Sequence, residues 1–365
     1  MSLNRRSFLA VTAAGLTLAA TRRSMADEAS MQWADVRDWG VEGRAFNDTE
    51  AWFDRLPGRA KGVVRDAVWN LSRHSAGMQV RFRTDATEIH VDYAVTSENL
   101  AMPHMPATGV SGLDLYARDE DGSWKWVAVL PPKSKMTKTK LVSGLRPGLR
   151  DYAIYLPLYN GTEFLKIGVA KEAKFETTAP RKDKPIVFYG TSITHGACAT
   201  RPGMPHPSIL GRRLNLPIVN LGFSGNGKME KEVAQFLCEI DPAVYVIDCL
   251  PNMSAEEVTE RTGPLVKQLR TAHADVPIVL VEDRSYSGSW LLDGQRQRNE
   301  TSRAALKKEY QTLLDAGTSK LSYIDGESLL GADRDDTTDG SHPSDLGFFR
   351  HADAFEPVLR KAIAG

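Results

Sequence analysis

The sequence predicts two domains of different class. The first is an N-terminal antiparallel β-sandwich, jelly-roll-like, and the second is a three-layer α/β/α domain with a five-stranded parallel sheet. Short runs of alternating apolar and polar residues, separated by turn residues, fill the chain from residue 31 to residue 178. Many short strands at this spacing are typical of sandwiches. From residue 179 onward, apolar runs alternate with segments of helical periodicity, which indicates a parallel sheet covered by helices on both faces.

Six segments in the first part have the alternation of half-buried strands. Turn-forming runs such as RDEDGS (118–123) and YNGT (159–162) separate them. Trp124 and Trp126 alternate along one strand and so share a face, which we interpret as core packing of the sandwich. We expect residues 31–178 to form this accessory domain. The strand segments are MQVRFRT (78–84), EIHVDYAV (88–95), LDLYARD (113–119), WKWVAVL (124–130), YAIYLPL (152–158) and EFLKIGVA (163–170).

The second domain, residues 179–365, is expected to alternate strands and helices. Ser254 and Glu257 have the spacing of a capping box at the start of one helix, and a last helix follows His342. In such parallel sheets, binding and catalytic sites form at the carboxyl ends of the strands. The expected strands are 185–189, 217–221, 243–250, 277–282 and 321–324, and the expected internal helices are 227–240, 254–273 and 298–317.

Composition excludes several classes of function. The 365-residue chain has 46 basic and 46 acidic side chains, and 42% of its residues are hydrophobic. This balance is ordinary for a globular protein and argues against a nucleic-acid partner bound through its phosphates. Three cysteines, Cys198, Cys238 and Cys249, are too few for a disulfide scaffold. We interpret them as buried, unreactive thiols.

Residues 1–26 have the features of an export signal. Arg5 and Arg6 precede an apolar run at 8–20, and the small-residue pattern SMA stands just before Asp27. The arginine pair followed by Ser, Phe and Leu resembles a twin-arginine signal, with a general secretory signal as the alternative. No second apolar run reaches membrane-spanning length. We therefore expect a bacterial protein that is periplasmic or secreted, without a membrane anchor once the signal is removed.

Polar residues stand where the predicted strands of the second domain end. Ser192 follows the first strand in GTSIT, Gly222 follows the second in NLGFSGNG, and Asn252 follows the third in DCLPN. The loop after the fifth strand contains TTDGSHPSD, with Asp339 three residues before His342. Because the strands are parallel, these residues are expected to converge at one edge of the sheet.

These residue types are those that a serine nucleophile needs. A serine hydroxyl is a weak nucleophile and requires a base such as His342, and Asp339 can orient the imidazole and stabilise its charged form. The oxyanion of the reaction needs preorganised donors, for which the backbone amides of Ser192 and Gly222 and the side chain of Asn252 are candidates. Alone, each has a structural explanation: a polar turn, a tight turn or the start of a helix. Their order along successive strand ends favours a catalytic site.

With these residues in place, the second domain resembles the SGNH hydrolases, the superfamily that includes GDSL-type esterases and lipases. The resemblance covers about residues 184–364, with GTSI in place of the Gly-Asp-Ser-Leu form and Asp339 in the usual D-x-x-H arrangement. In the first domain, GVSGLDLYARD resembles the G-x-D-L-Y signature of an N-terminal β-sandwich module. The resemblance implies a module of this kind in front of an SGNH domain, as in a group of exported bacterial hydrolases. The matching residues are Gly112, Asp114, Leu115 and Tyr116.

Four further residues are candidates for substrate binding. Arg284, Tyr286 and Trp290 follow the fourth strand, where aromatic faces could stack on sugar rings and arginine could bind hydroxyl or carboxylate groups. A surface loop packed on its neighbour is the alternative. His195, three residues after Ser192, is interpreted as a pocket-wall or loop residue and not as the base. His195 and His206 lack metal-ligand spacing with a carboxylate cluster, so neither a metal nor a cofactor is expected.

We therefore expect an exported serine esterase that hydrolyses carboxylic esters through an acyl-enzyme. Export, an accessory sandwich and the lack of a conspicuous apolar lid favour acetyl groups on a carbohydrate as substrate, a small molecule or a polysaccharide. Hydrolysis of lipid esters or thioesters is the alternative within the superfamily. A glycan-binding protein with a weakly active hydrolase domain is the alternative from another class.

Overall fold

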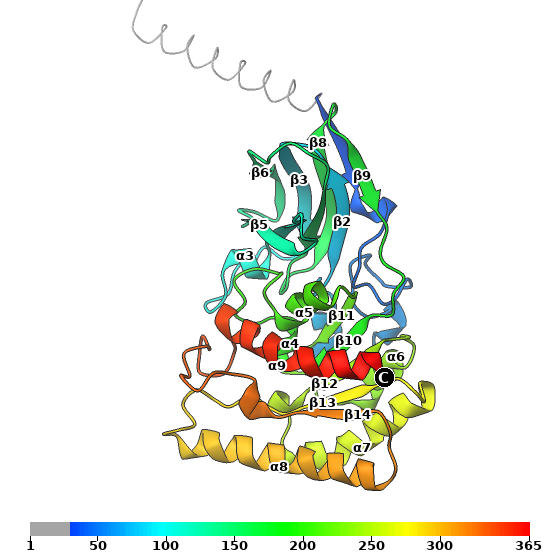
Figure 1. Ribbon diagram of the computed structural model, residues 1–365, viewed down its shortest axis with the longest axis vertical. Coiled ribbons are helices and arrows are strands. Elements are labelled where there is room, and N and C mark those ends of the chain that lie inside the picture. Colours follow the sequence, from blue (N-terminus) through cyan, green and yellow to red (C-terminus); the bar gives the residue numbers. More distant parts are fainter. Residues whose placement is uncertain (1–29) are drawn as a thin grey trace, which may run out of the picture.

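The computed structural model describes residues 30–365 and has a β-sandwich stacked on an α/β domain (Figure 1). The predicted export signal lies outside the described residues. One sheet of the sandwich has the strand order β1-β8-β3-β6 and the other the order β5-β4-β7-β2-β9, with antiparallel pairing throughout. The strands are β1 (Met31–Asp35), β2 (Gln79–Thr84), β3 (Glu88–Val95), β4 (Leu113–Arg118), β5 (Trp124–Leu130), β6 (Met136–Ser143), β7 (Arg150–Tyr155), β8 (Thr162–Ala170) and β9 (Phe175–Thr178).

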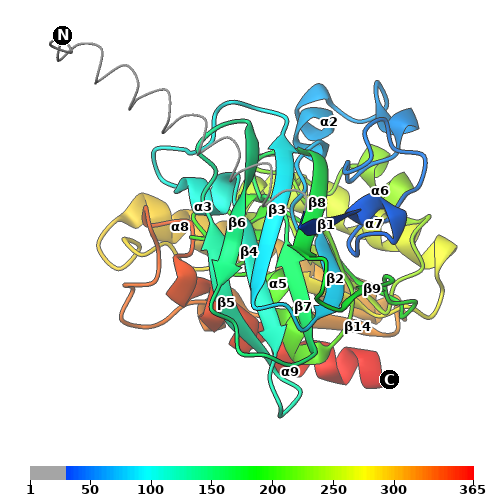
Figure 2. The same ribbon diagram turned by 90° about the horizontal axis from the view of Figure 1, so that it is seen from above.

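The sandwich encloses an apolar core between its two sheets. Phe82 of β2 stacks on Tyr152 of β7, and Leu165 of β8 packs in the same buried cluster. Alternate residues of each strand point into this cluster because successive side chains of a strand lie on opposite faces. Seen from above, the sandwich strands lie over the α/β domain (Figure 2). The predicted sandwich is therefore confirmed.

The second domain has a five-stranded sheet in which every pair of neighbours is parallel, as predicted. In the order β11-β10-β12-β13-β14, the first strand of the domain, β10, lies between the second strand, β11, and the third, β12. The strand order therefore reverses direction at β10. No helix of residues 30–365 is long and apolar enough to cross a membrane. The strands are β10 (Ile186–Gly190), β11 (Ile218–Gly222), β12 (Val244–Asp248), β13 (Ile278–Val281) and β14 (Leu321–Ile324).

Helices cover both faces of this sheet, so its strands are apolar on both sides. Phe188 of β10 belongs to the buried cluster on the sandwich side of the sheet, and Tyr189 belongs to the buried cluster on the opposite side. Figure 1 shows α5 and α9 between the sheet and the sandwich, and α7 and α8 on the far side. On the sandwich side lie α5 (His206–Leu214) and α9 (Asp345–Ala364), and on the far side lie α6 (Lys231–Leu237), α7 (Ala255–Ala272) and α8 (Asp293–Asp315).

Several boundaries differ from the expected ones. The third strand ends at Asp248 and not at residue 250, because a 3₁₀ turn with Pro251 follows. Helix α8 begins five residues before the expected position, at Asp293. The start of α7 has the predicted capping box, in which Ser254 accepts from the Glu257 N–H and the Glu257 carboxylate accepts from the Ser254 N–H.

The segment from residue 46 to residue 72 does not pack only within the sandwich. A short helix, α2 (Asp66–Ser72), and the irregular chain before it pack on the α/β domain. Phe46, Leu56 and Trp69 belong to the same buried cluster as Val219 of β11. The sequence places the domain boundary near residue 179, but this apolar core contains residues from both sides of that boundary. A seven-residue helix is too short to give a clear periodic signal.

The G-x-D-L-Y segment forms part of the contact between the two domains. Asp114, which has 0% exposure, accepts hydrogen bonds from the backbone N–H of Gly203 at 2.8 Å and from Arg201 at 3.0 Å. A Cβ at Gly203 would lie 2.4 Å from the ring of Tyr116, so only glycine fits there. The motif therefore binds the loop that follows the serine segment of the α/β domain.

Candidate active site

Ser192 lies at the carboxyl end of β10, on the first residue of the short helix α4 (Ser192–His195). Thr191 caps this helix, and its side chain accepts a hydrogen bond from the Ile193 N–H. At Gly190 a Cβ would lie 2.0 Å from the Thr194 hydroxyl oxygen, so a side chain there would displace the turn. Ser192 is 8% exposed, and its Oγ lies 2.8 Å from Nε2 of His342.

Asp339 holds His342 in the orientation that this contact requires. One carboxylate oxygen lies 2.7 Å from Nδ1 of His342, and the other accepts from the backbone N–H groups of His342 and Ser341. An acceptor at Nδ1 selects the tautomer with its proton there, which leaves Nε2 free to accept the Ser192 proton. Burial acts to raise the pKa of Asp339, but the hydrogen bonds and charge of His342 outweigh it, so the pKa is lowered overall.

Two other carboxylates near this loop, those of Asp336 and Asp345, have different partners. Asp336 is buried and binds Arg350 at 2.7 Å and the Gly331 N–H at 2.6 Å. Asp345 accepts from the Thr200 N–H at 3.0 Å. Asp339 is therefore the carboxylate that contacts the His342 ring.

Arg284 does not face a substrate, and the expectation that it binds one is wrong. Its side chain is 1% exposed and forms an ion pair with Asp283. Its Nε donates to the Ser341 carbonyl at 2.8 Å, and its Nη2 contacts the Ser341 hydroxyl. Arg284 thus supports the loop of His342 from the protein interior. Tyr286 packs on the Arg284 guanidinium at 4.1 Å, and Trp290 is 70% exposed, so the binding roles of these two residues stay predictions.

The placement of His195 also differs from the expected pocket wall. Its ring is fully buried, stacks on Tyr159 with centroids 4.1 Å apart, and its Nε2 lies 2.7 Å from the Leu158 carbonyl oxygen. Burial lowers its pKa well below the usual range, so the ring is neutral and Nε2–H is the donor. His195 connects α4 to the first domain and cannot contact a substrate.

Gly222 is not available as an oxyanion donor. Its N–H donates to Oδ1 of Asn220 at 2.9 Å, while the Asn220 amide donates to the Thr194 carbonyl at 2.7 Å. What position 222 requires is the absence of a side chain, because a Cβ would lie 2.3 Å from the backbone nitrogen of His195. The expected donor role of Gly222 is therefore corrected to a packing role beneath α4.

The loop after β11 also orients Asn252. With its oxygen directed at them, the Asn252 side chain accepts from the N–H groups of Asn226 at 3.1 Å and Gly227 at 3.2 Å. These contacts assign the amide orientation and leave Nδ2 as a free donor among the described residues. The N–H groups of Ser192 and Gly225 likewise have no protein acceptor within residues 30–365. Gly225 has φ +68°, a conformation that favours glycine.

The first domain contributes to this site, which the sequence did not predict. Arg55, which is 1% exposed, donates to the carbonyls of Asn220 at 3.0 Å and Gly222 at 2.8 Å. The Tyr159 hydroxyl lies 3.4 Å from the Ser192 carbonyl oxygen. The exposed ring of His104 stacks beside that of His342, with centroids 6.5 Å apart. No local pattern marks these residues, because their contacts join segments far apart in the chain.

Cys198 lies beside the Asp339–His342 pair. Of the residues that the structure describes, these three form the group that could bring ligand atoms together, within 4.8 Å of one another. Burial, followed by the charge of Asp339, raises the pKa of the Cys198 thiol to about 11, which disfavours the thiolate that binds metals. All three cysteines are free thiols; Cys198 and Cys249 are buried, and Cys238 is partly exposed.

Comparison with known proteins identifies the class of this fold and site. Residues 183–360 match the GDSL-like lipase/acylhydrolase family, and residues 31–175 match the GxDLY N-terminal module of SGNH hydrolase-type esterases. A crystal structure from Bacteroides ovatus ATCC 8483, named as a GDSL-like lipase, has 32% identity and a TM-score of 0.87, and the match covers 92% of this chain and 98% of the other. The chain belongs to the GDSL-like lipase/acylhydrolase family of SGNH hydrolases.

More distant structures share the fold alone. The salicylyl-acyltransferase SsfX3 from a tetracycline biosynthetic pathway has 18% identity and a TM-score of 0.73, with 91% of this chain and 97% of that chain covered. A family two carbohydrate esterase from Cellvibrio japonicus has 12% identity and a TM-score of 0.59, with 92% and 98% covered. A search of curated proteins finds no match.

Proposed function

We propose that the protein is an exported carbohydrate acetylesterase that uses Ser192, His342 and Asp339 as its catalytic residues. The observation that carries the proposal is the continuous hydrogen-bond chain from the Ser192 hydroxyl through His342 to Asp339, at 2.8 and 2.7 Å. Each group has the partner that its role in ester hydrolysis demands.

In the proposed reaction, Ser192 Oγ attacks the ester carbonyl carbon while His342 Nε2 takes the hydroxyl proton. The carbonyl oxygen becomes an oxyanion, and the free donors around it, Ser192 N–H, Gly225 N–H and Asn252 Nδ2, stabilise its charge. The tetrahedral intermediate then releases the sugar oxygen, which receives the proton from His342, and leaves an acyl-enzyme. A water molecule, deprotonated by His342, attacks that ester and releases the carboxylic acid and the serine hydroxyl.

The proposed substrate is an acetylated carbohydrate. Family membership supports an ester hydrolase, and the likeness to carbohydrate esterases of the same fold favours sugar esters. The first domain also places His104 beside His342, with ring centroids 6.5 Å apart. Lipid esters and thioesters are the alternative substrates.

Acetate release from acetylated polysaccharides tests this proposal. We expect purified protein to release acetate from at least one of acetylated xylan, glucomannan or pectin, and to hydrolyse p-nitrophenyl acetate faster than p-nitrophenyl octanoate. Ser192→Ala should abolish both activities. Faster turnover of the octanoyl ester would favour a lipid substrate, and undiminished release by Ser192→Ala would overturn the assignment. Binding of glycans without any serine-dependent turnover would favour a binding protein.

Export is proposed from the arginine pair of the first residues. Replacement of Arg5 and Arg6 by lysine should leave the precursor in the cytoplasm, because the twin-arginine pathway reads this pair. Fractionation of cells that express each form measures the outcome. Undiminished export of the lysine form would indicate the general secretory route.

A further inference from the structure

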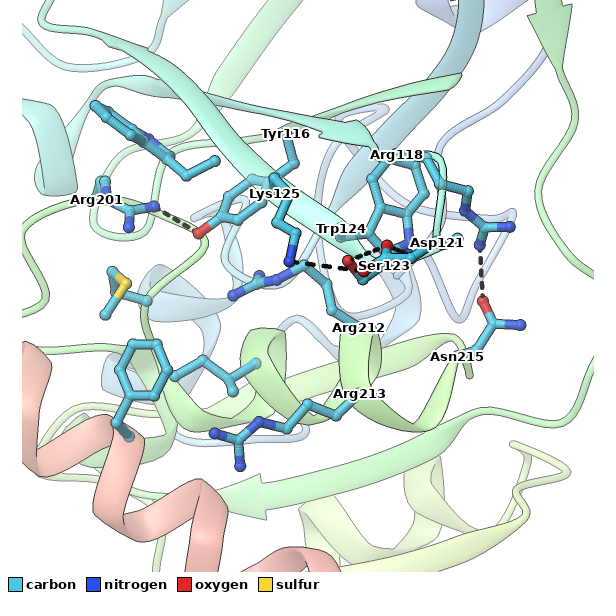
Figure 3. Close-up of a pocket in the computed structure, with 15 residues that line it drawn as sticks. Tyr116, Arg118, Asp121, Ser123, Trp124, Lys125, Arg201, Arg212, Arg213 and Asn215 are labelled. Carbon is cyan, nitrogen blue, oxygen red and sulfur yellow. Dashed lines mark hydrogen bonds and ion pairs between the residues drawn. The ribbon is translucent and has the colours of Figure 1, made fainter. Parts of the chain in front are cut away.

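A pocket of about 640 Å³ lies between the sandwich and helices α5 and α9. This volume is in the range of small-molecule sites. In Figure 3, Lys125 of the sandwich points toward Arg212 of helix α5, while Arg118 points toward Asn215, which follows that helix. Ser192, Asp339 and His342 are not among the residues that line it. The pocket is thus separate from the site of the proposed hydrolysis.

The lining has five basic side chains and one carboxylate, Asp121, which lies 3.9 Å from the Lys125 amine. Two guanidinium groups of the lining lack a carboxylate partner. Arg201 pairs with Asp114, and Arg213 pairs with carboxylates of α9. Arg212 forms no ion pair within residues 30–365, and its Nη1 is buried without a hydrogen-bond partner. Arg118 contacts the amide oxygen of Asn215 through Nη2 at 3.3 Å and lies over the Trp124 ring at 5.1 Å, and its Nε is unpartnered. Arg212 lies over the Tyr116 ring at 4.1 Å, but a partly buried cation without a carboxylate partner is costly unless an anion completes the site.

Aromatic rings share this pocket with the cations, and this corrects the expectation that Trp124 and Trp126 pack in the sandwich core. In the register of β4 and β5, Trp126 pairs with Tyr116, and Trp124 pairs with Arg118. Opposite residues of antiparallel strands point to the same face. Tyr116 and Arg118 face away from the sandwich core, so both tryptophans do too, and Trp126 is 50% exposed.

Trp126 is held in place for a stacking contact. Its indole nitrogen donates to Asp114 at 2.9 Å, so the ring has a fixed orientation beside Arg201, whose guanidinium lies 5.0 Å from the ring. Rings of this kind stack on the apolar faces of sugars. Arginine forks bind carboxylates through two parallel hydrogen bonds. A neutral sugar would leave the cations unpaired, and a simple inorganic anion would leave the tryptophan unused.

We propose that this pocket binds a carboxylated sugar, a hexuronate unit of an acidic polysaccharide. The carboxylate pairs with Arg212, beside Lys125, and the pyranose ring lies against Trp126. This inference rests on the proposed carbohydrate substrate and specifies its class as a polyuronate. The pocket also adjoins the catalytic loops, because the segment that carries Arg201 binds Asp345 through Thr200, three residues after His342.

Calorimetric titration of the Ser192→Ala protein with oligogalacturonate tests the proposal without hydrolysis. We expect binding that weakens as NaCl is raised, and no comparable binding of a neutral cello-oligosaccharide of the same length. Arg212→Gln should weaken binding roughly 10- to 100-fold, as expected for loss of a charged hydrogen-bond partner. Lys307→Gln on α8 removes the same charge from an exposed position on the far side, and it should leave affinity unchanged.

Two further variants guard against a folding defect in Arg212→Gln. Lys125→Gln and Trp126→Ala, at more exposed positions, should each weaken the same binding while the melting temperature stays close to that of the parent. Equal affinity for uronate and neutral oligosaccharides, or unchanged binding in all three variants, would overturn the proposal. Tighter binding of a sulfated, uronate-free oligosaccharide would overturn the carboxylate assignment.

Kinetics separate this inference from the proposed function. With serine active, Arg212→Gln should raise KM for acetylated pectin and leave the kcat for p-nitrophenyl acetate unchanged. If no acetylated substrate is hydrolysed while oligogalacturonate still binds, the proposed function fails and the binding site stands. If acetate is released but Arg212→Gln leaves the pectin KM unchanged, the binding site fails and the esterase stands.

Discussion

Ser192 and His342 meet at 2.8 Å, but they are held in place in different ways. Ser192 is 8% exposed and lies on a buried turn that contacts the first domain through Tyr159 and His195. The side chains of His342 and Asp339 are 27% and 41% exposed. Their loop is fixed by hydrogen bonds within the α/β domain. The nucleophile is thus positioned by packing between domains, and the base by a polar loop at the surface.

The first domain helps to position the nucleophile Ser192. Arg55 binds the carbonyls at the end of β11, and Asn220 of that strand binds the helix of Ser192. The first domain is therefore part of the scaffold of the nucleophile and not an independent appendage. Changes to the first-domain residues that support the serine segment, such as Arg55, are expected to act mainly on stability, and a change at Asp339 is expected to act on turnover.

The largest loss of kcat is expected from substitution of Ser192 or His342, the two residues in direct contact. Ser192→Ala or His342→Ala should each lower kcat by roughly 10⁴ to 10⁶, because nucleophile and base act as a unit. The double variant should be little worse than either single one. Steady-state kinetics on p-nitrophenyl acetate measures this, and additive losses would show that His342 does not serve Ser192.

Asp339→Asn tests the base side alone. Its loss should lower kcat by up to about 10⁴-fold, because an amide at this position disturbs the tautomer and the stabilisation of the imidazolium. The melting temperature should change little, because the side chain is partly exposed. Full activity of this variant would assign the orientation of His342 to its other neighbours.

Asn252→Ala tests the proposed oxyanion donor. We expect kcat and kcat/KM to fall together by roughly 10² to 10³, with KM little changed, because the hydrogen bond forms to the transition state. The alternative role at the start of α7 is already taken by Ser254, whose side chain caps that helix. A lower melting temperature with unchanged kcat would remove Asn252 from the site.

Arg55→Met tests the serine side from the first domain. Four backbone carbonyls would each lose a hydrogen bond, the buried ones of Asn220 and Gly222 and the partly buried ones of Leu71 and His74. The free energy of unfolding should fall by about 3 kcal/mol or more, with a smaller effect on kcat than in Asn252→Ala. Arg83→Met, on the exposed sandwich surface, is the matched control and should stay within about 0.5 kcal/mol of the parent. Unchanged stability of Arg55→Met would contradict a structural role of the first domain.

The sequence was sufficient for the class of both domains and for the candidate serine, aspartate and histidine, because strand ends and the three-residue spacing are local patterns. Directions of side chains were not predictable in the same way. His195 lies three residues after Ser192, and Arg284 follows the end of a neighbouring strand, but both side chains are buried in the interior. Gly222 has the right position for a donor, but a neighbouring side chain takes its N–H. Such outcomes depend on partners distant in the chain.

The most direct test of the central claim is covalent labelling of the nucleophile. Diethyl p-nitrophenyl phosphate phosphorylates activated serines and forms an adduct that resists hydrolysis. We expect one adduct per chain, on the peptide that contains Ser192, in proportion to the activity lost. His342→Ala should react far more slowly, because its serine lacks a base. An adduct on another residue, or inactivation without modification of Ser192, would contradict the account.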